Sequence, residues 1–474
     1  MTLRVFPFLF FKIDFPDVLG FDIDTAWLKV VYSFVMFKYL IQNEERNTMQ
    51  RKFFDIDDRL LDLAAQTEGD IKSAFERIEN NAFQNQQKVL AAFINNNVGE
   101  SSFTSSTGYG YGDVGREKLD KVFADAMECE DAIIRHNFMC GTHALTVALF
   151  GVLRPNDTML CVTGMPYDTI QSVIGISKQP ASGSLAEFGI KFDKVDLLED
   201  GGVDLDEMRR RLRADSSVKM VYIQRSRGYT LRPSLTVEKI EEICKAAKEV
   251  KPEVIVMVDN CYGEFVQLTE PCCHGADLMA GSLIKNAGGG IASTGGYIAG
   301  RSDLVEMCSY RLSTPGTGRE VGCTLGHSRE MYMGLFAAPH VVGEALKTAA
   351  FCAGLFSRLG YGVTPQPNDE RADIIQSVML RNPESLIAFC QGVQSGSPVD
   401  SMALPEPWDM PGYDNQIIMA SGSFTLGSSI ELSADAPLRE PYAAWMQGGL
   451  NYAAGKTGIL IAAQRMLDKG LLCL

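Results

Sequence analysis

A lysine and an aspartate each follow an apolar run of this 474-residue chain, at positions where α/β proteins place reactive groups. Asp259 ends the run at residues 254–258, and Lys285 follows the run at 278–280, with Ser282 three residues before it. A lysine shielded from water can lose its proton and form a Schiff base with a carbonyl compound. Taken alone, a lysine at a strand end can equally be structural or bind phosphate, so its neighbours must decide between these alternatives.

Asp259 makes the carbonyl chemistry more specific. A carboxylate at the end of so apolar a run is costly to bury unless a cation or several hydrogen-bond donors satisfy it. The protonated pyridine nitrogen of pyridoxal phosphate is such a cation, and an aspartate beside it lets the ring absorb carbanion charge. The alternative for an isolated aspartate is to cap the next turn. With Lys285 a short distance downstream, the sequence favours a pyridoxal phosphate site.

The same site needs an anchor for the phosphate. Gly141 and Thr142 open a predicted helix over residues 142–152, and the free N–H groups at a helix start can hold a dianion. The alternative for Thr142 is a plain N-cap. Tyr167 follows the next predicted strand, where it either stacks on the pyridine ring or packs in the core. Glycines at 288–290, just after Lys285, would let backbone and cofactor approach closely.

Alternating elements must position these residues. Apolar runs predict strands at residues 132–134, 159–162, 220–223, 254–258, 278–280 and 296–299. Helical patterns fall at 117–127, 142–152, 169–176 and 237–250. Buried strands alternating with helices indicate an α/β fold with a parallel or mixed sheet covered on both faces. Because ligands of such sheets bind beyond the carboxyl ends of the strands, the candidate residues share one site.

A glycine motif suggests a competing function. Gly110, Gly112 and Gly115 have the spacing G-x-G-x-x-G, which binds a dinucleotide when a strand runs directly into it. Here the preceding residues 101–107 are polar and read as a loop. Binding of NAD is therefore the least favoured of the functions considered.

The chain divides into four expected parts. Residues 1–48 differ in pattern from the rest of the chain, and we interpret them as an N-terminal extension. Residues 49–115 form a helical segment and an interface loop, 116–315 the large cofactor-binding α/β domain, and 316–474 a small C-terminal domain. Neither apolar run in residues 1–48 reaches the roughly 20 residues that span a bilayer, so we expect no membrane partner.

Composition excludes other classes of function. The net charge of -15 argues against a nucleic-acid partner. The twelve cysteines show no paired C-x-x-C spacing, which is typical of reduced thiols in a cytosol-like compartment, so we expect a cytoplasmic protein, an organelle being the alternative. Cys272, Cys273 and His274 lack a second ligand pair at zinc spacing, so we expect no metal site.

The ordered set Cys140-Gly141-Thr142, Tyr167, Asp259 and Ser282-x-x-Lys285 resembles the fold-type I pyridoxal-phosphate enzymes. Three longer strings resemble the methionine gamma-lyase-like family, also labelled aluminium-resistance proteins. They are VDNCYGEF, AGSLIKNAGGGIASTGGYIAG and SPVDSMALPEPWDMPGYDNQIIMASGSFTLGSSIELSADAPLREPY. The resemblance implies the fold-type I transferase fold: a large domain with a mostly parallel sheet covered by helices, and a smaller α+β C-terminal domain.

The resemblance also implies a reaction. The expected enzyme is a pyridoxal-phosphate-dependent carbon-sulfur lyase of the cystathionine beta-lyase or methionine gamma-lyase type. Its substrate is a sulfur-containing amino acid, and its products are a thiol, ammonia and a 2-oxo acid. Lys285 is then the Schiff-base lysine and general base, and Tyr262 donates a hydrogen bond to the phenolic oxygen of the cofactor. An aminotransferase of the same fold is the alternative.

Further roles are implied by related cystathionine and methionine lyases, in which a tyrosine and an arginine reach across a subunit interface to the neighbour's cofactor phosphate. Tyr109 or Tyr111, with Arg116, occupy comparable positions, which implies a homodimer or homotetramer with shared active sites. Tyr111 is also the candidate for assisting the leaving group. Arg439 and Arg371 are the candidates for binding the substrate carboxylate, because a bidentate arginine suits that group.

Overall fold

The computed structural model describes residues 53–177, 182–410 and 415–474. Residues Asp57–Leu474 form one compact unit. A second unit, Met1–Ile56, is described only over its last four residues. The predicted extension at residues 1–48 lies outside the described residues, as do four residues of the PEPWDMPGYD segment.

A seven-stranded sheet forms the centre of the larger part of this unit. Its spatial order is β1-β7-β6-β5-β4-β2-β3, and among these strands β7 runs antiparallel to its two neighbours. The strands are β1 (Asp131–Arg135), β2 (Thr158–Cys161), β3 (Lys191–Lys194), β4 (Val218–Gln224), β5 (Ile255–Asp259), β6 (Leu278–Ser282) and β7 (Gly296–Gly300). The predicted mostly parallel sheet is confirmed. Strand β3, which the sequence did not suggest, has the polar sequence KFDK and lies at the edge.

Helices cover this sheet on both faces, as the sequence predicts. They are α4 (Val114–Ala126), α5 (Gly141–Val152), α6 (Asp168–Ile174), α7 (Leu205–Ala214), α8 (Val237–Val250) and α9 (Ser302–Leu312). Helix α8 shows why such segments are helical: Val237, Ile240, Ile243 and Ala247 recur on one face and are buried. Thr236 caps its start, where the side chain accepts a hydrogen bond from the backbone N–H of Lys239.

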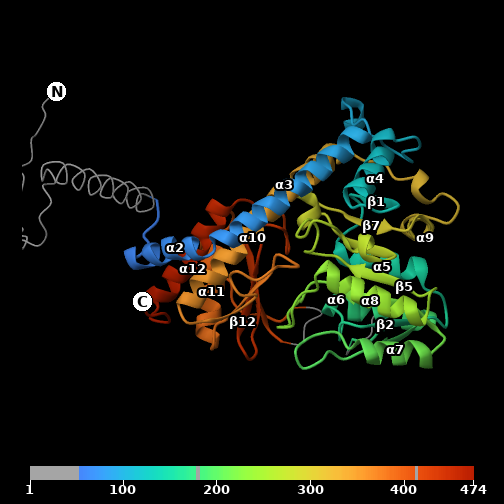
Figure 1. The fold of residues 1–474 in the computed structure, drawn as a ribbon. Helices are drawn as coiled ribbons and strands as arrows, with labels where there is room; N and C mark the ends of the chain where they lie inside the picture. The colour runs from blue at the N-terminus through green and yellow to red at the C-terminus, as the bar shows by residue number, and fades with distance from the viewer. Residues whose placement is uncertain (1–52, 178–181, 411–414) are drawn as a thin grey trace, which may run out of the picture. The chain divides into compact units, whose positions relative to one another are not determined.

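A second sheet follows in the C-terminal part. It is antiparallel, with the order β10-β11-β12-β9-β8. Its strands are β8 (Gly362–Thr364), β9 (Gln376–Met379), β10 (Ile417–Ser421), β11 (Ser433–Pro437) and β12 (Ala443–Gln447). Helices α11 (Pro383–Ser395) and α12 (Tyr452–Asp468) pack against each other beside it (Figure 1).

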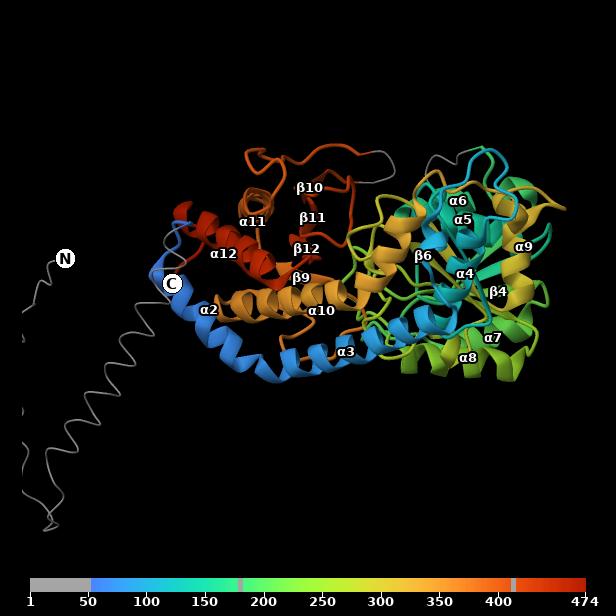
Figure 2. The ribbon, with the colours of Figure 1, turned by 90° about the horizontal axis from the view of Figure 1, so that it is seen from above.

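Long helices join the two parts. Helix α2 (Asp58–Asp70) and helix α3 (Lys72–Asn95) both contact helix α10 (Ser328–Arg358). Figures 1 and 2 show α3 running beside α10 from the C-terminal sheet toward the seven-stranded sheet. The predicted boundary at residues 315 and 316 falls between α9 and α10. Short 3-10 helices are η1 (Glu100–Phe103), η2 (Ala186–Phe188), η3 (Pro271–His274), η4 (Asn286–Gly288) and η5 (Gly318–Glu320).

The described part of the chain has neither a membrane-spanning helix nor a metal-binding cluster. None of its helices is both long enough and apolar enough to cross a membrane. None of its clusters of histidine, cysteine, aspartate and glutamate could hold a metal ion. His274 instead bonds Thr269 and Glu241 through its two ring nitrogens. All twelve cysteines are free.

Candidate active site

A cavity of about 360 Å³ opens where the carboxyl ends of β4, β5 and β6 face β11 and β12. Six of the predicted site residues line it: Gly141, Thr142, Tyr167, Asp259, Ser282 and Lys285. Tyr262, predicted from the resemblance, lines it as well. The structure therefore brings together residues separated by more than a hundred positions in the chain, as the strand-end rule predicts.

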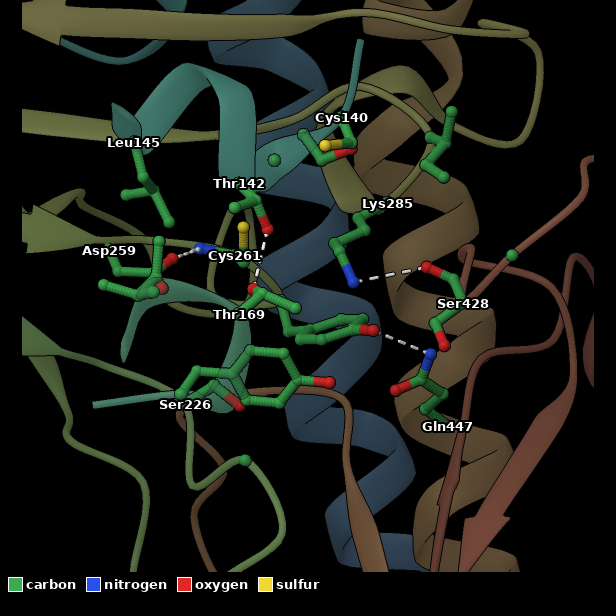
Figure 3. A pocket seen from close by; sticks show the side chains of 18 of the residues that line it. Cys140, Thr142, Leu145, Thr169, Ser226, Asp259, Cys261, Lys285, Ser428 and Gln447 are labelled. Carbon is green, nitrogen blue, oxygen red and sulfur yellow. Dashed lines mark hydrogen bonds between the residues drawn. The ribbon is translucent and has the colours of Figure 1, made fainter. Parts of the chain in front are cut away.

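Lys285 extends into this cavity (Figure 3). Its Nζ donates a hydrogen bond to the backbone carbonyl of Ser428 at 3.2 Å and lies 3.6 Å from the centre of the Tyr262 ring. Burial lowers the pKa of Lys285, but the facing Tyr262 and Cys261 outweigh burial, so the net shift is upward. A reactive amine is thus held at a fixed point of the cavity wall.

Asp259 ends β5 in register with Gln224 of β4 and Ala280 of β6. Its carboxylate accepts hydrogen bonds from the backbone N–H of Cys261 at 3.2 Å and from the Tyr222 hydroxyl at 3.5 Å. Burial raises the pKa of this carboxyl, because these donors do not fully replace water. A cation placed beside it in the cavity would stabilise its charged form.

Tyr262 has an unusual backbone. Its φ is +71°, in the left-handed region that non-glycine residues seldom adopt. The conformation places the ring under Lys285, and the hydroxyl accepts a hydrogen bond at 2.9 Å from Nε2 of Gln447 on β12. Strain of this kind concentrates where surrounding contacts enforce a functional geometry.

One corner of the cavity suits an anion. Gly141 begins α5, and a Cβ added there would lie 3.3 Å from Ser282 Cβ and from Cys261 Sγ. The Ser282 hydroxyl is buried and has no hydrogen-bond partner. Thr142 faces the same corner and its Oγ1 lies 2.8 Å from Thr169 Oγ1. A helix start beside an unpartnered hydroxyl fits the phosphate of the expected cofactor.

Comparison with known proteins decides the family. The family model described as methionine gamma-lyase matches residues 60–467. The chain belongs to the methionine gamma-lyase family. The predicted class of pyridoxal-phosphate-dependent lyases is thereby confirmed at the level of the family.

Individual relatives agree with this family assignment. A crystal structure of a carbon-sulfur lyase involved in aluminium resistance from Clostridium novyi NT is 51% identical, with a TM-score of 0.84, covering 87% of this chain and 96% of that one. The protein YnbB of Bacillus subtilis is 46% identical over 409 residues, which are 86% of this chain and 97% of YnbB. The pyridoxal-5'-phosphate-dependent protein YhfS from Escherichia coli, at 15% identity and a TM-score of 0.56, shares the fold. The predicted fold-type I architecture is confirmed.

Three residues that the family resemblance assigned to a subunit interface lie outside the cavity of their own chain. Tyr109 and Tyr111 are 75% and 64% exposed, and their ring centres are 5.7 Å apart. Arg116, in contrast, is only 1% exposed, and its Nη1 donates to the carbonyls of Gly110 and Gly322 at 2.8 and 2.7 Å. Its guanidinium donates to carbonyls of its own chain, and its contact with a neighbour's phosphate stays a prediction.

The glycine motif at the same loop serves packing. A 3-10 helix and a loop, not a strand, precede it. A Cβ on Gly110 would lie 2.8 Å from Cys323 Cα, and one on Gly115 would lie 2.3 Å from the Ser102 carbonyl oxygen. Glycine is needed at these positions because a side chain would clash with neighbouring backbone. This packing role agrees with the low rank given to a dinucleotide site.

Neither arginine predicted to bind the substrate carboxylate lines the cavity. Arg371 is buried, and its Nη2 donates to Gln376 Oε1 at 2.7 Å. Arg439 is exposed beyond the end of β11 and donates to the Tyr229 carbonyl at 3.4 Å. Their contact with the substrate carboxylate stays a prediction.

The glycine run after Lys285 also has a different role from the predicted close approach to the cofactor. None of Gly288, Gly289 and Gly290 lines the cavity. A Cβ on Gly289 would lie 2.4 Å from the carbonyl oxygen of Gly334 in α10, and φ at Gly289 is +55°. The run lets α10 pack against the segment that carries the lysine.

Many residues of the cavity wall were not predicted from the sequence, and five of them bear on its chemistry. They are Tyr229, Ser428, Asp435, Trp445 and Gln447. Gln447 is the last residue of the apolar strand β12, so attention to strand ends could have found it. Asp435 lies inside a strand of small residues, SADAP, and nothing local distinguishes it from a surface aspartate.

Proposed function

We propose that this protein is a pyridoxal-phosphate-dependent carbon-sulfur lyase that acts on a sulfur-containing amino acid. The observation that carries the proposal is one cavity in which the Lys285 amine, the buried Asp259 carboxylate and the unpartnered Ser282 hydroxyl all face the same space. The family and the carbon-sulfur lyase from Clostridium novyi support this choice of reaction.

The residues of the cavity fit the cofactor at both of its ends. The backbone N–H groups at the start of α5 and the Ser282 hydroxyl would hold the phosphate. Asp259 would hold a proton on the pyridine nitrogen, which also removes the cost of burying an unpaired carboxylate. Tyr167 lines the cavity beside them and would pack on the ring. Pyridoxal phosphate, when bound, supplies an electron sink for a carbanion at the substrate α-carbon.

Lys285 performs the proton transfer in this proposal. Its Nζ accepts the α-proton of the substrate as general base. The Tyr262 ring and the Ser428 carbonyl hold this nitrogen in place. Elimination then breaks a carbon-sulfur bond and the sulfur leaves as a thiol after taking up a proton. Water converts the remaining unsaturated amine into ammonia and a 2-oxo acid, so atoms balance with one water consumed.

We propose a homo-oligomer in which neighbouring chains complete each other's cavities. Tyr109 and Tyr111 are large, exposed and outside the cavity of their own chain, which is where residues donated to a neighbour must lie. Tyr111 is the candidate for assisting the leaving sulfur in the neighbouring cavity. With no arginine lining the cavity among the described residues, a neighbour is also a source of a cation for the substrate carboxylate.

The test is release of 2-oxo acid and ammonia from cystathionine, methionine, homocysteine and cysteine in separate reactions. We expect both products from at least one substrate, and their loss in Lys285→Ala. Lys239→Ala, which removes an exposed lysine of α8, is the matched control and should keep full activity. Transfer of the amine to an added 2-oxo acid without ammonia release would replace the lyase with the aminotransferase alternative.

A further inference from the structure

A network of polar side chains is buried next to the cavity residues without lining the cavity. The members of this buried network are each 0% exposed: Arg225, Asn260, Glu264, Glu270, Asn286 and Tyr297. Three of them directly follow cavity residues in the sequence: Asn260 follows Asp259, Arg225 follows Gln224 and Asn286 follows Lys285. Consecutive side chains of a strand point to opposite faces. The ends of β4 and β5 therefore each supply one side chain to the cavity and the next to the buried network.

Hydrogen bonds run through the buried network from one site segment to another. Asn260 Nδ2 donates to the Tyr297 hydroxyl at 3.3 Å, and that hydroxyl donates to Glu264 Oε1 at 2.8 Å. Asn286 Nδ2 donates to the backbone carbonyl of Glu264 at 3.0 Å. The residue after the site aspartate is thus connected to the residue after the site lysine.

The buried network also packs directly on the backbone that carries the site. Gly281 precedes the serine of the phosphate corner, and a Cβ there would lie 2.6 Å from Glu264 Oε1 and 2.8 Å from the Tyr297 hydroxyl oxygen. Gly263 follows the tyrosine under the lysine, and a Cβ there would lie 2.6 Å from Arg225 Nη1. A shift of these side chains would therefore move the segments that hold the site residues.

An ion pair is part of the buried network. Arg225 Nη1 lies 3.4 Å from Glu270 Oε2 and donates to Asn260 Oδ1 at 2.8 Å. Asn260 Nδ2 in turn donates to Glu270 Oε2 at 3.1 Å. Apolar side chains of the same volume are often as stabilising as a buried ion pair, so stability alone does not account for this arrangement. Satisfied buried hydrogen bonds instead specify one geometry for the groups that they join.

We propose that Tyr297 is a positioning residue that fixes Lys285 relative to Asp259 through the buried network. This inference rests on the cofactor of the proposed function and not on its lyase reaction. A cofactor held at Asp259 and at the phosphate corner bonds to the lysine only if its aldehyde meets the amine. The amine and the aldehyde then form a Schiff base and release one water. A small displacement of the amine weakens this bond and leaves the other contacts in place.

Two forms of the cofactor isolate the position of the lysine. Pyridoxal phosphate forms the Schiff base, whereas pyridoxine phosphate has an alcohol in place of the aldehyde and binds only through the remaining contacts. The affinity ratio of the two compounds, measured by calorimetric titration of cofactor-free protein, reports the alignment of Lys285. Tyr297→Phe removes both hydrogen bonds of the hydroxyl. It should reduce the preference for pyridoxal phosphate about 10-fold, as for one lost hydrogen bond, and change the affinity for pyridoxine phosphate by about 2-fold or less.

Tyr332→Phe is the matched control. It removes a similarly buried hydroxyl, which donates to the Gly115 carbonyl at 2.8 Å and lies outside the buried network. It should lower the melting temperature to a similar degree and leave the affinity ratio unchanged. If Tyr297→Phe does not fold, as judged by circular dichroism, Asn286→Ala tests the same connection, because it removes the bond to the Glu264 carbonyl next to the lysine.

The outcomes separate this inference from the lyase function. An unchanged affinity ratio in Tyr297→Phe, or an equal loss of affinity for both compounds, would overturn the inference and leave the buried network with a structural role. Equal affinities of the unsubstituted protein for the two compounds, or no binding of either, would overturn it together with the cofactor assignment. The expected change in the ratio, without cleavage of any sulfur-containing amino acid, would support the inference and remove the lyase function.

Discussion

The side-chain nitrogen of Lys285 lies 3.6 Å from the centre of the Tyr262 ring, well inside the distance at which an ammonium group and an aromatic face attract. Tyr262 holds this position with a left-handed backbone and through its hydroxyl, which accepts a hydrogen bond from Gln447 of the other sheet. The reactive amine is therefore positioned by both sheets at once.

Tyr262→Phe should lower the pKa of Lys285, because the hydroxyl contributes to the upward shift. Only the unprotonated amine can attack a carbonyl group. The pH midpoint for association of pyridoxal phosphate with cofactor-free protein should therefore move to lower pH, which stopped-flow absorbance would measure. Tyr310→Phe, which alters an exposed tyrosine of α9 bonded to Glu306, serves as the control. An unchanged midpoint in Tyr262→Phe would contradict this role.

Ser282→Ala should lower the affinity for the cofactor without lowering the thermal stability of the cofactor-free protein. The Ser282 hydroxyl is buried without a partner, so its loss should leave the melting temperature of cofactor-free protein unchanged or raise it. Affinity for pyridoxal phosphate, measured by fluorescence titration, should fall by about 10-fold or more, since a hydrogen bond to a charged group is lost. Ser328→Ala removes another buried, unpartnered hydroxyl outside the cavity and should not alter affinity. Equal affinities in both variants would argue against the phosphate corner.

Glu264 should make stability depend on pH. Burial raises the pKa of this carboxyl to about 8, although the Tyr297 hydroxyl donates to it at 2.8 Å. Between its ordinary value of 4.5 and about 8, the unfolded chain has lost this proton and the folded chain retains it. The native state therefore loses stability as pH rises through that window.

Glu264→Gln removes this titration while keeping the shape of the side chain. The free energy of unfolding of the variant, relative to the unsubstituted protein, should increase between about pH 5 and about pH 8. Urea denaturation at both pH values would measure the difference. The exposed Glu249→Gln should show no such trend, and a constant difference for Glu264→Gln would show that Glu264 is ionised in the folded protein.

The strand-end rule explains why so much of the site could be found from the sequence. Asp259 and Lys285 follow strongly apolar strands that pair side by side in the sheet, so their meeting is a consequence of strand order. Arg371 and Arg439 could not be placed in this way. They belong to the second sheet and its turns, whose position against the first depends on packing between distant segments.

The place of Asp435 in the cavity wall could not be predicted from the local sequence either. Its strand is short and composed of small residues, and its burial comes from Tyr229 and Ser428, which are distant in the sequence or lie in a loop. The contacts of Arg116 could not be predicted either, because its guanidinium donates to the carbonyl of Gly322, more than two hundred residues away in the sequence. Local patterns carry no information about such partners.

Shared active sites predict complementation between two inactive variants. Lys285→Ala keeps Tyr111, and Tyr111→Ala keeps Lys285, so a mixed dimer would contain one intact site. Random reassociation of equal amounts should restore about a quarter of the unsubstituted activity. Denaturation and refolding of the mixture, followed by the product assay, would measure it, with each variant refolded alone as the control. Activity in Tyr111→Ala alone would remove Tyr111 from the reaction, and no recovery from two inactive variants would place both residues in one chain's site.

The most direct test of the central claim is to load the protein with pyridoxal phosphate, reduce it with borohydride and locate the modified peptide by mass spectrometry. Reduction makes the bond between the cofactor and its lysine permanent. The cavity geometry predicts modification of Lys285 and loss of the modification in Lys285→Ala. Modification of a different lysine, or none under conditions that label a known pyridoxal-phosphate enzyme, would contradict the assignment of this cavity as the active site.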